Sequence, residues 1–358
     1  MMNDATTCID CKACMKGCLM MEEFTDSPKT LLESIKDSPA NVAFSCAACG
    51  YCAHVCPRDI SIQEYFVERK KALAPSELHN FGYKAVLFHQ VLSFSKPLTA
   101  IKKFSTTDYS HMAFMPGCAL SSYSPKLVES IINHLQKVSP GMGVLMQCCG
   151  KPTRVLGDMP RFEQFYSTLE RDIERLGATT IVTACENCYM SLKELSPHLK
   201  TISLYEWLDK MGIPECSFEH ATPVALHDPC PTRHEYELHE SVRSLLRKMK
   251  LPFVEFKNCR DKTECCGSGG MLELTNPKLA KQQMLSRAQQ TTCETIVSYC
   301  QECARSMSRG GKNGVHILDL LFTPSVAQSF KQPLHGTLTS WMNRYKTKQM
   351  IKNFKVNT

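Results

Sequence analysis

Cysteine supplies 21 of the 358 residues of this chain, and eighteen of these cysteines fall into four regularly spaced sets. Such abundance arises from a disulfide framework or from metal ligation. Disulfide frameworks are typical of short secreted chains, whereas this sequence opens with neither the basic nor the apolar region of a signal peptide. It also lacks an uncharged apolar stretch of about 18 residues that could span a bilayer. We therefore expect a cytoplasmic protein that binds metal.

The first two sets share the spacing C-x2-C-x2-C-x3-C, and Pro57 follows the second run where Leu19 follows the first. In the bacterial ferredoxin run, three cysteines bind one [4Fe–4S] cubane and the fourth binds the other. The expected ligands of cubane 1 are Cys8, Cys11, Cys14 and Cys56. The expected ligands of cubane 2 are Cys46, Cys49, Cys52 and Cys18. Zinc is the alternative, but it prefers four ligands in two separated pairs. Because thiolates fill every position, these clusters are expected to carry electrons only.

The other ten cysteines form two copies of one pattern, in which a single cysteine is followed by Cys-Cys-Gly and then by C-x-x-C. The first copy comprises Cys118, Cys148, Cys149, Cys185 and Cys188. The second copy comprises Cys230, Cys265, Cys266, Cys300 and Cys303. Equivalent cysteines lie 112 to 117 residues apart, and Thr180-Ile181-Val182 recurs as Thr295-Ile296-Val297. This half of the chain is therefore a duplication.

Apolar strands and helices alternate in both copies, which predicts an α/β architecture with a mainly parallel sheet. Strands are expected at 112–115, 143–147, 224–227 and 253–257, with helices at 160–176 and 277–290. The cysteine groups follow strands, and ligands gather at the carboxyl ends of parallel strands. Five thiols can therefore converge in each copy. In the alternative reading, one cysteine of each pair is merely buried and zinc or a cubane takes the other four, but the same surplus occurs in both copies.

These residues resemble the heterodisulfide reductase family, whose cysteine-rich "CCG" domains carry this pattern and whose fused subunit has the same domain order. The resemblance implies that each five-cysteine set holds a noncubane [4Fe–4S] cluster and that the two clusters face each other across a substrate disulfide. It thus implies two cubane and two noncubane clusters. Because no flavin or nicotinamide fingerprint is present, we expect an electron-exchanging partner subunit of the flavoprotein, hydrogenase or membrane cytochrome type. Such a partner could hold the protein at the inner face of the membrane.

The expected fold is α+β and α/β, with a small α-helical bacterial-ferredoxin-like dicluster domain followed by two duplicated α/β CCG domains. The dicluster domain is expected at 1–74 and a helical connector at 75–110, with helices near 62–73 and 81–94. These helices pack the domains together or, alternatively, dock a partner. The CCG domains are expected at 111–215 and 216–325, and a solvated basic tail at 326–358.

Three functions compete at this point. A disulfide reductase subunit acting on a small-molecule disulfide or thiol is favoured, because both five-cysteine sets are complete. Similar iron–sulfur subunits of glycolate, lactate and anaerobic glycerol-3-phosphate dehydrogenases usually have one degraded set and act as relays. A zinc-based structural protein is the third possibility. The formal charge of +7 would suit a polyanion, but four bound clusters lower it to roughly −3, so we expect no nucleic-acid partner.

Several further residues invite a role near the clusters. His227 and His234 flank Cys230 and could donate protons, although a structural role is equally consistent with the sequence. The glycine-rich Gly267–Gly270 segment predicts close backbone approach to a cluster or a substrate. Three arginines beside the motifs could select an anionic disulfide, namely Arg154, Arg233 and Arg305. Three cysteines lie outside the sets and are read as small buried or spare thiols, namely Cys216, Cys259 and Cys293.

Overall fold

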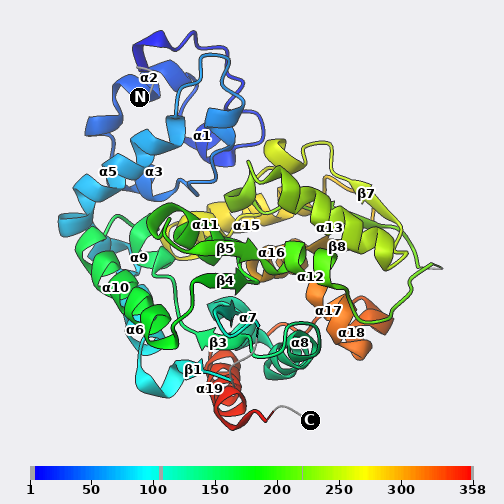
Figure 1. Ribbon diagram of the computed structural model, residues 1–358. Helices are drawn as coiled ribbons and strands as arrows, with labels where there is room; N and C mark the ends of the chain where they lie inside the picture. The colour runs from blue at the N-terminus through cyan, green and yellow to red at the C-terminus, as the bar shows by residue number, and fades with distance from the viewer. Residues whose placement is uncertain (1–4, 105–107, 220, 356–358) are drawn as a thin grey trace.

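The N-terminal lobe is built from short helices that wrap around the first two cysteine runs. The computed structural model describes residues 5–104, 108–219 and 221–355, and this lobe lies at the top of Figure 1. Its helices are η1 (Ala5–Thr7), α1 (Leu19–Phe24), α2 (Pro28–Glu33), η2 (Ile35–Asp37), α3 (Ala40–Phe44), α4 (Tyr51–His54) and α5 (Ile62–Glu77). Apolar side chains such as Met21, Leu32 and Phe66 bury their surface between these helices. The expected helical dicluster domain is thereby present.

The connector contains the second expected helix and a strand that its sequence did not reveal. Its elements are η3 (Leu78–Phe81), α6 (Tyr83–Ser93), η4 (Lys96–Leu98) and β1 (Ala100–Lys102). Gly82 adopts φ +69° between η3 and α6, a conformation that glycine reaches without steric cost. The three residues of β1 pair antiparallel with β3 and close one edge of the first sheet.

The first cysteine-rich domain is a five-stranded sheet with helices between its strands. Its elements are β2 (Met112–Met115), α7 (Cys118–Tyr123), α8 (Pro125–Val138), β3 (Gly143–Met146), α9 (Lys151–Val155), α10 (Met159–Leu176), β4 (Thr180–Thr183), α11 (Glu186–Leu195), β5 (Lys200–Ser203) and α12 (Leu204–Met211). The strand order is β1-β3-β2-β4-β5, and every pair except β1–β3 is parallel. Gly177 ends α10 in the left-handed conformation, as the sequence predicts.

The second cysteine-rich domain repeats this plan with four parallel strands in the order β7-β6-β8-β9. Its first elements are β6 (Val224–His227), η5 (Cys230–Thr232), α13 (Tyr236–Lys248), β7 (Phe253–Glu255), η6 (Arg260–Lys262), η7 (Gly269–Met271) and α14 (Leu272–Thr275). The remainder are α15 (Pro277–Ala288), β8 (Thr295–Ser298), α16 (Gln301–Arg309), β9 (Asn313–His316), α17 (Ile317–Phe322) and α18 (Pro324–Ser329). The predicted elements of both copies are present, and their ends differ from the expected bounds by one or two residues.

The expectation of a solvated C-terminal tail is wrong. Helix α19 (Thr337–Asn353) folds back onto α7, α8 and β1 of the first cysteine-rich domain, and it lies at the opposite end of the molecule from the N-terminal lobe (Figure 1). Arg344, Thr347 and Ile351 are buried along its inner face. These contacts depend on residues more than 200 positions upstream, so the local composition of the tail does not reveal them.

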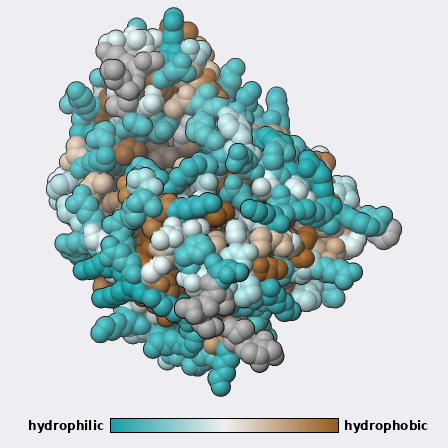
Figure 2. All heavy atoms as spheres, viewed as in Figure 1, coloured by the Kyte–Doolittle hydropathy of each residue, from teal (hydrophilic) through white to brown (hydrophobic). Residues whose placement is uncertain are grey.

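One hydrophobic core joins the two cysteine-rich domains. It contains strand residues of both sheets, such as Val144 and Leu226, together with Ile351 of α19. The Tyr205 hydroxyl crosses between the domains and donates to the Tyr299 carbonyl at 2.7 Å. The face seen in Figure 2 is mainly hydrophilic, with hydrophobic atoms confined to small patches and hollows. No helix within the described ranges is long and apolar enough to cross a membrane.

Candidate iron–sulfur centres

The first cubane set is brought together at the outer end of the N-terminal lobe. Cys8, Cys11, Cys14 and Cys56 line one cavity, so the fourth cysteine of the second run meets the first three of the first run. Burial, followed by the neighbouring thiols, raises the pKa of Cys14 to about 12. A thiol in such a place stays protonated in water, and a bound metal is the group that would deprotonate it.

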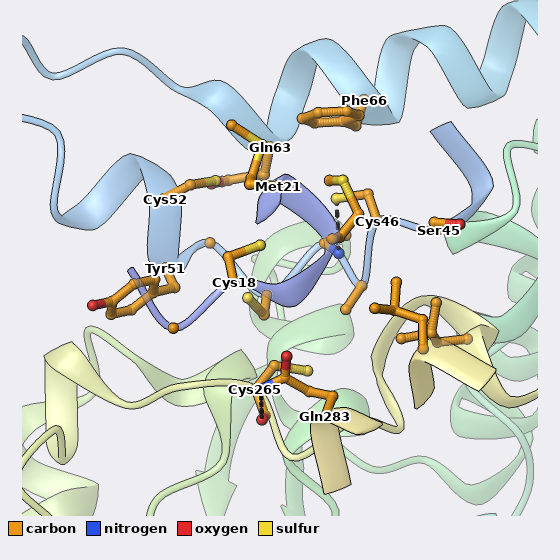
Figure 3. Close-up of a pocket in the computed structure, with 18 residues that line it drawn as sticks. Cys18, Met21, Ser45, Cys46, Tyr51, Cys52, Gln63, Phe66, Cys265 and Gln283 are labelled. Carbon is orange, nitrogen blue, oxygen red and sulfur yellow. Dashed lines mark hydrogen bonds between the residues drawn. The ribbon is translucent and has the colours of Figure 1, made fainter. Parts of the chain in front are cut away.

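The second cubane set lies at the inner end of the lobe, where the lobe meets the second cysteine-rich domain. Figure 3 shows Cys18, Cys46 and Cys52 around one cavity beneath Phe66, with Cys265 approaching from below. Cys49 lines the same cavity. Burial raises the pKa of Cys18 and of Cys52. The placement of Cys18 with the second run is the crossover that the ferredoxin spacing predicts.

Lys70 adds a buried positive charge beside the second cubane set, and sequence reasoning missed it. It lies on α5 with 1% of its surface exposed, and its Nζ donates to the Cys46 carbonyl at 2.6 Å. Burial lowers the pKa of Lys70, while the Cys46 thiol opposes that shift. Within the described residues no carboxylate forms an ion pair with this ammonium. A cation buried in this way calls for an anion, which a thiolate-ligated cluster provides.

In the first cysteine-rich domain, the five cysteines meet at the carboxyl ends of β2, β3 and β4. Cys118 begins α7, Cys148 and Cys149 follow β3, and Cys185 caps α11. Gly117 has φ +79°, and a Cβ there would lie 2.7 Å from the Cys185 Cβ. Glycine at this position therefore lets the Cys118 turn close onto the C-x-x-C turn.

The thiols of this first set form a chain of contacts. Cys118 hydrogen-bonds to Cys148, and Cys149 hydrogen-bonds to Cys188, which in turn contacts Cys185. The hydrogen bond from Cys148 lowers the pKa of Cys118 well below its usual range. All five sulfurs therefore belong to one cluster of side chains.

The second set repeats these contacts one for one. Cys230 hydrogen-bonds to Cys265, and Cys266 lies 3.3 Å from Cys303, which contacts Cys300. The two C-x-x-C turns are also built alike, because the Cys185 and Cys300 amides donate to the hydroxyl of the serine or threonine two residues earlier. The fifth cysteine thus occupies an equivalent place in each copy.

His227 faces the second set and has no counterpart in the first copy, where Met115 occupies the equivalent position. One of its ring nitrogens lies within 4.8 Å of the Cys266 and Cys303 sulfurs. Arg287 donates to His227 Nδ1 at 3.3 Å, and burial together with this cation lowers the pKa of His227 to about 3. The histidine is therefore neutral at physiological pH. His234 lies elsewhere, with its ring 5.7 Å from that of His54 on the N-terminal lobe.

The N-terminal lobe docks through backbone contact beside the second set. Gly270 has φ +63°, and a Cβ there would lie 2.6 Å from the Cys46 carbonyl oxygen. Arg233 Nη2 donates to the Cys49 carbonyl at 3.0 Å and to the Thr263 carbonyl at 2.8 Å. The glycine-rich segment therefore admits the cubane-binding loop of the lobe, which corrects the expectation that it approaches a substrate.

The two five-cysteine sets meet through the side chain of Glu186. This residue belongs to the C-x-x-C of the first copy, is 2% exposed, and reaches Cys300 of the second. Burial and the thiols of Cys300 and Cys185 raise the pKa of Glu186 well above its usual range. Lys151 also lies near thiols of both sets, Cys149 and Cys230. The two sets therefore face each other across a short polar seam.

The three arginines expected to select an anionic substrate are occupied by other contacts. Arg154 pairs with Glu194, and Arg305 pairs with Glu273 and Glu302. Arg233 is buried against backbone carbonyls, including that of Asp261. Cys259 and Cys293 pack against the small core behind the second set, and Cys216 packs against the main core.

The donor chemistry suits iron–sulfur clusters. Eighteen thiols gather in four groups, most of them buried, and buried cations lie beside two of these groups. Thiolates are the usual ligands of iron–sulfur clusters, and net charge with hydrogen bonds to sulfur sets the reduction potential. The groups of four match a cubane, and the groups of five exceed it.

Comparison with protein families agrees with this domain order. Residues 7–61 match the 4Fe-4S dicluster domain family, and residues 112–193 and 224–308 each match the cysteine-rich domain family. The expectation of a dicluster domain followed by two cysteine-rich domains is confirmed.

Three relatives illustrate where such chains occur. An iron–sulfur-type subunit of the fumarate reductase (CoM/CoB) of Methanothermobacter marburgensis is 23% identical, over 90% of this chain and 72% of that protein. An uncharacterised iron–sulfur protein of Methanococcus maripaludis is 24% identical, over 83% of this chain and 66% of that protein. The glycolate oxidase iron–sulfur subunit of Escherichia coli is 23% identical, over 56% of this chain and 54% of that subunit.

Proposed function

We propose a function from one premise, that the chain is a heterodisulfide reductase-like iron–sulfur protein with a dicluster domain followed by two cysteine-rich domains. In this proposal electrons pass through two cubanes to two noncubane [4Fe–4S] centres, at which a disulfide is reduced. The cubane ligands are Cys8, Cys11, Cys14 and Cys56 for one, and Cys46, Cys49, Cys52 and Cys18 for the other. The noncubane ligands are Cys118, Cys148, Cys149, Cys185 and Cys188, and Cys230, Cys265, Cys266, Cys300 and Cys303.

The observation that carries the proposal is the repeated fifth thiol. Cys149 contacts Cys188 as Cys266 contacts Cys303, and both pairs are buried within their sets. A cubane takes four thiolates. A fifth thiol in the same place in both copies therefore favours a centre of another type over a second pair of relay cubanes.

The two facing sets also match the stoichiometry of disulfide reduction. The S–S bond breaks, each sulfur gains one electron and one proton, and two thiols leave. When bound, the two centres would supply one electron each. The chain's own residues bury the thiols, and Glu186 and Tyr205 link the two domains. This arrangement favours a single substrate between the sets over two independent sites.

The order of the centres supports entry of electrons through the N-terminal lobe. Cys265 of the second set lines the cavity of the second cubane set, while the first cubane set lies at the outer end of the lobe. A partner that exchanges electrons would bind near Cys11, which is exposed. Two of the relatives are named as subunits of a reductase and an oxidase, which favours a role within a complex.

The decisive experiment counts iron and acid-labile sulfide in anaerobically purified protein and records EPR spectra after thiol treatment. We expect about sixteen irons and a thiol-dependent paramagnetic signal beside the reduced-cubane signals. C149S and C266S should each weaken the thiol-dependent signal and spare the cubane signals. C216S is the control, because Cys216 lies in the main core away from the sets. About eight irons with cubane signals alone would refute the proposal.

An electron-transfer subunit of a flavoprotein 2-hydroxy-acid or glycerol-3-phosphate dehydrogenase is the second candidate. The similarity to the glycolate oxidase iron–sulfur subunit and to the lactate utilization protein A of Oceanobacillus iheyensis favours it. Turnover distinguishes the two functions. Consumption of a disulfide with a reduced dye as sole donor supports the reductase, whereas co-purification with a hydroxy-acid flavoprotein and no disulfide turnover supports the relay.

A further inference from the structure

Helix α19 holds the element that presents Cys118. Asn343 Nδ2 donates to the Tyr123 carbonyl at 2.9 Å, and Thr347 Oγ1 donates to the Ser121 carbonyl at 2.8 Å. Both carbonyls belong to α7, the helix that begins at Cys118. The C-terminal helix is therefore fixed in register with the first five-cysteine set.

Arg344 projects from this helix into the protein interior and is 1% exposed. Its Nε donates to the Leu98 carbonyl at 3.3 Å, and its Nη2 donates to the Ser93 carbonyl at 3.0 Å. Its Nη1 is buried without an oxygen or nitrogen partner in the described part of the chain. The guanidinium lies within hydrogen-bonding reach of the Cys118 sulfur.

The charge of Arg344 is balanced by sulfur alone. Its nearest charged neighbours are the thiols of Cys118, Cys148 and Cys188, and no ion pair with a carboxylate involves it among the described residues. A buried cation without an anion is costly. The thiols of the first set, once they ligate an anionic cluster, supply the missing negative charge.

The second set has no equivalent cation at its sulfurs. Arg287 is the nearest comparable residue, but it donates to His227 Nδ1 and to the Asn258 carbonyl. Glu264 and Asp228 also face Arg287 and offset its charge. Arg233 lies beside Cys49 of the second cubane set. The first set is therefore the more electropositive of the two.

We propose that Arg344 is a positioning residue that raises the reduction potential of the first five-cysteine centre above that of the second. The inference rests on the proposed function, because it requires a cluster at each set. Positive charge and N–H donors near cluster sulfurs stabilise the reduced, more negative state. The centre farther from the cubanes would then attract the electron more strongly, which draws electrons away from the N-terminal lobe.

The test is an anaerobic redox titration, followed by EPR, of the whole protein and three variants. R344Q removes the charge, R344K keeps it, and K346Q removes an exposed charge from the same helix. We expect R344Q to shift the reduction equilibrium of the first centre at least tenfold towards the oxidised state, about 59 mV for one electron. R344K should shift it less, and K346Q should leave it unchanged. An unshifted R344Q with about sixteen irons would overturn the inference and leave the proposed function intact.

A second measurement keeps the inference testable if R344Q does not assemble. C266S leaves the first centre and C149S leaves the second, so the two potentials can be compared in proteins that retain Arg344. The first centre should titrate at the higher potential, and the reverse order would contradict the inference. An iron count of about eight in the unsubstituted protein would instead refute the proposed function itself.

Discussion

The thiols of Cys49 and Cys265 lie within hydrogen-bonding reach of each other across the boundary between the N-terminal lobe and the second cysteine-rich domain. That hydrogen bond, followed by burial, raises the pKa of Cys49 well above its usual range. Cys49 is an expected ligand of the second cubane, and Cys265 is an expected ligand of the second five-cysteine centre. The contact therefore brings two proposed centres as close as their ligands allow, and its integrity can be tested.

The first prediction concerns Gly270, which lets the two backbones touch. G270A places a Cβ 2.6 Å from the Cys46 carbonyl oxygen at a φ of +63°. The left-handed conformation costs about 1 kcal/mol for alanine, and overpacking adds typically 1–3 kcal/mol. We expect a lower midpoint in thermal unfolding and slower reduction of the second centre in stopped-flow experiments.

Gly311 offers a matched control for this substitution. It has φ +88°, and a Cβ there meets nothing within 4 Å. G311A therefore carries the conformational cost without the clash. If G270A and G311A lose the same stability and neither slows reduction, close approach at Gly270 has no part in electron transfer.

The second prediction concerns Arg233, which joins three backbone segments. R233M removes its hydrogen bonds to the carbonyls of Cys49, Asp261 and Thr263 and leaves buried acceptors without a donor. Each hydrogen bond to a charged group contributes roughly 1.5–3 kcal/mol, so a loss of about 3 kcal/mol or more is expected. Calorimetry should show the N-terminal lobe unfolding in an earlier, separate transition.

Arg305 provides the comparison, because it forms only half-exposed ion pairs with Glu273 and Glu302. R305M should cost less than about 1 kcal/mol. A single cooperative transition in R233M, with a midpoint like that of R305M, would show that Arg233 does not hold the lobe in place.

The third prediction concerns Gln90 of α6, which is fully buried beside the first five-cysteine set. Its Oε1 accepts from the Thr153 amide at 2.9 Å, and its Nε2 donates to the Cys148 sulfur at 3.8 Å. Q90L leaves the Thr153 N–H without a partner, which costs about 1–3 kcal/mol. It also removes a donor to sulfur, so the reduction potential of the first centre should fall.

Thermal unfolding and a redox titration together check this prediction for Q90L. The same exchange at exposed Gln164, Q164L, controls for a general effect of leucine. A stability loss without a change in potential would assign Gln90 to packing alone.

Much of the fold follows from local patterns. The parallel strands are short apolar runs, and the helices between them begin and end at recognisable residues such as Pro277 and Gly177. The ferredoxin spacing also anticipates that Cys18 lies with the second run and Cys56 with the first, where the structure places them. Regular spacing is informative here because each set obeys a local geometric rule.

The remaining features depend on packing between distant segments. Arg344 lies in a segment whose composition resembles a solvated tail, and its burial requires Ser93, Leu98 and α7. Lys70 occupies the inner face of an amphipathic helix, where a lysine is not expected. Strand β1 has only three residues and exists because β3 offers it an edge. No short motif marks any of these residues.

The last prediction concerns Asp319 in α17, which is fully buried near the Tyr123 hydroxyl. Burial raises its pKa from 3.8 to about 6, although hydrogen bonds from Thr323 and Tyr123 oppose the shift. The folded state therefore binds the proton more tightly than the unfolded state, and stability falls as the pH rises from about 4 to about 6. D319N removes this term and should stabilise the protein at neutral pH.

The pH dependence separates this effect from a change in packing. Between pH 5 and pH 7.5, the stability of D319N relative to the unsubstituted protein should increase by about 1 kcal/mol, because one pKa unit corresponds to about 1.4 kcal/mol. Thermal unfolding at both pH values measures it, with D26N at an exposed site as the control for net charge. If the difference between D319N and the unsubstituted protein is the same at both pH values, Asp319 is already ionised at pH 5 in the folded state, and its burial does not raise its pKa.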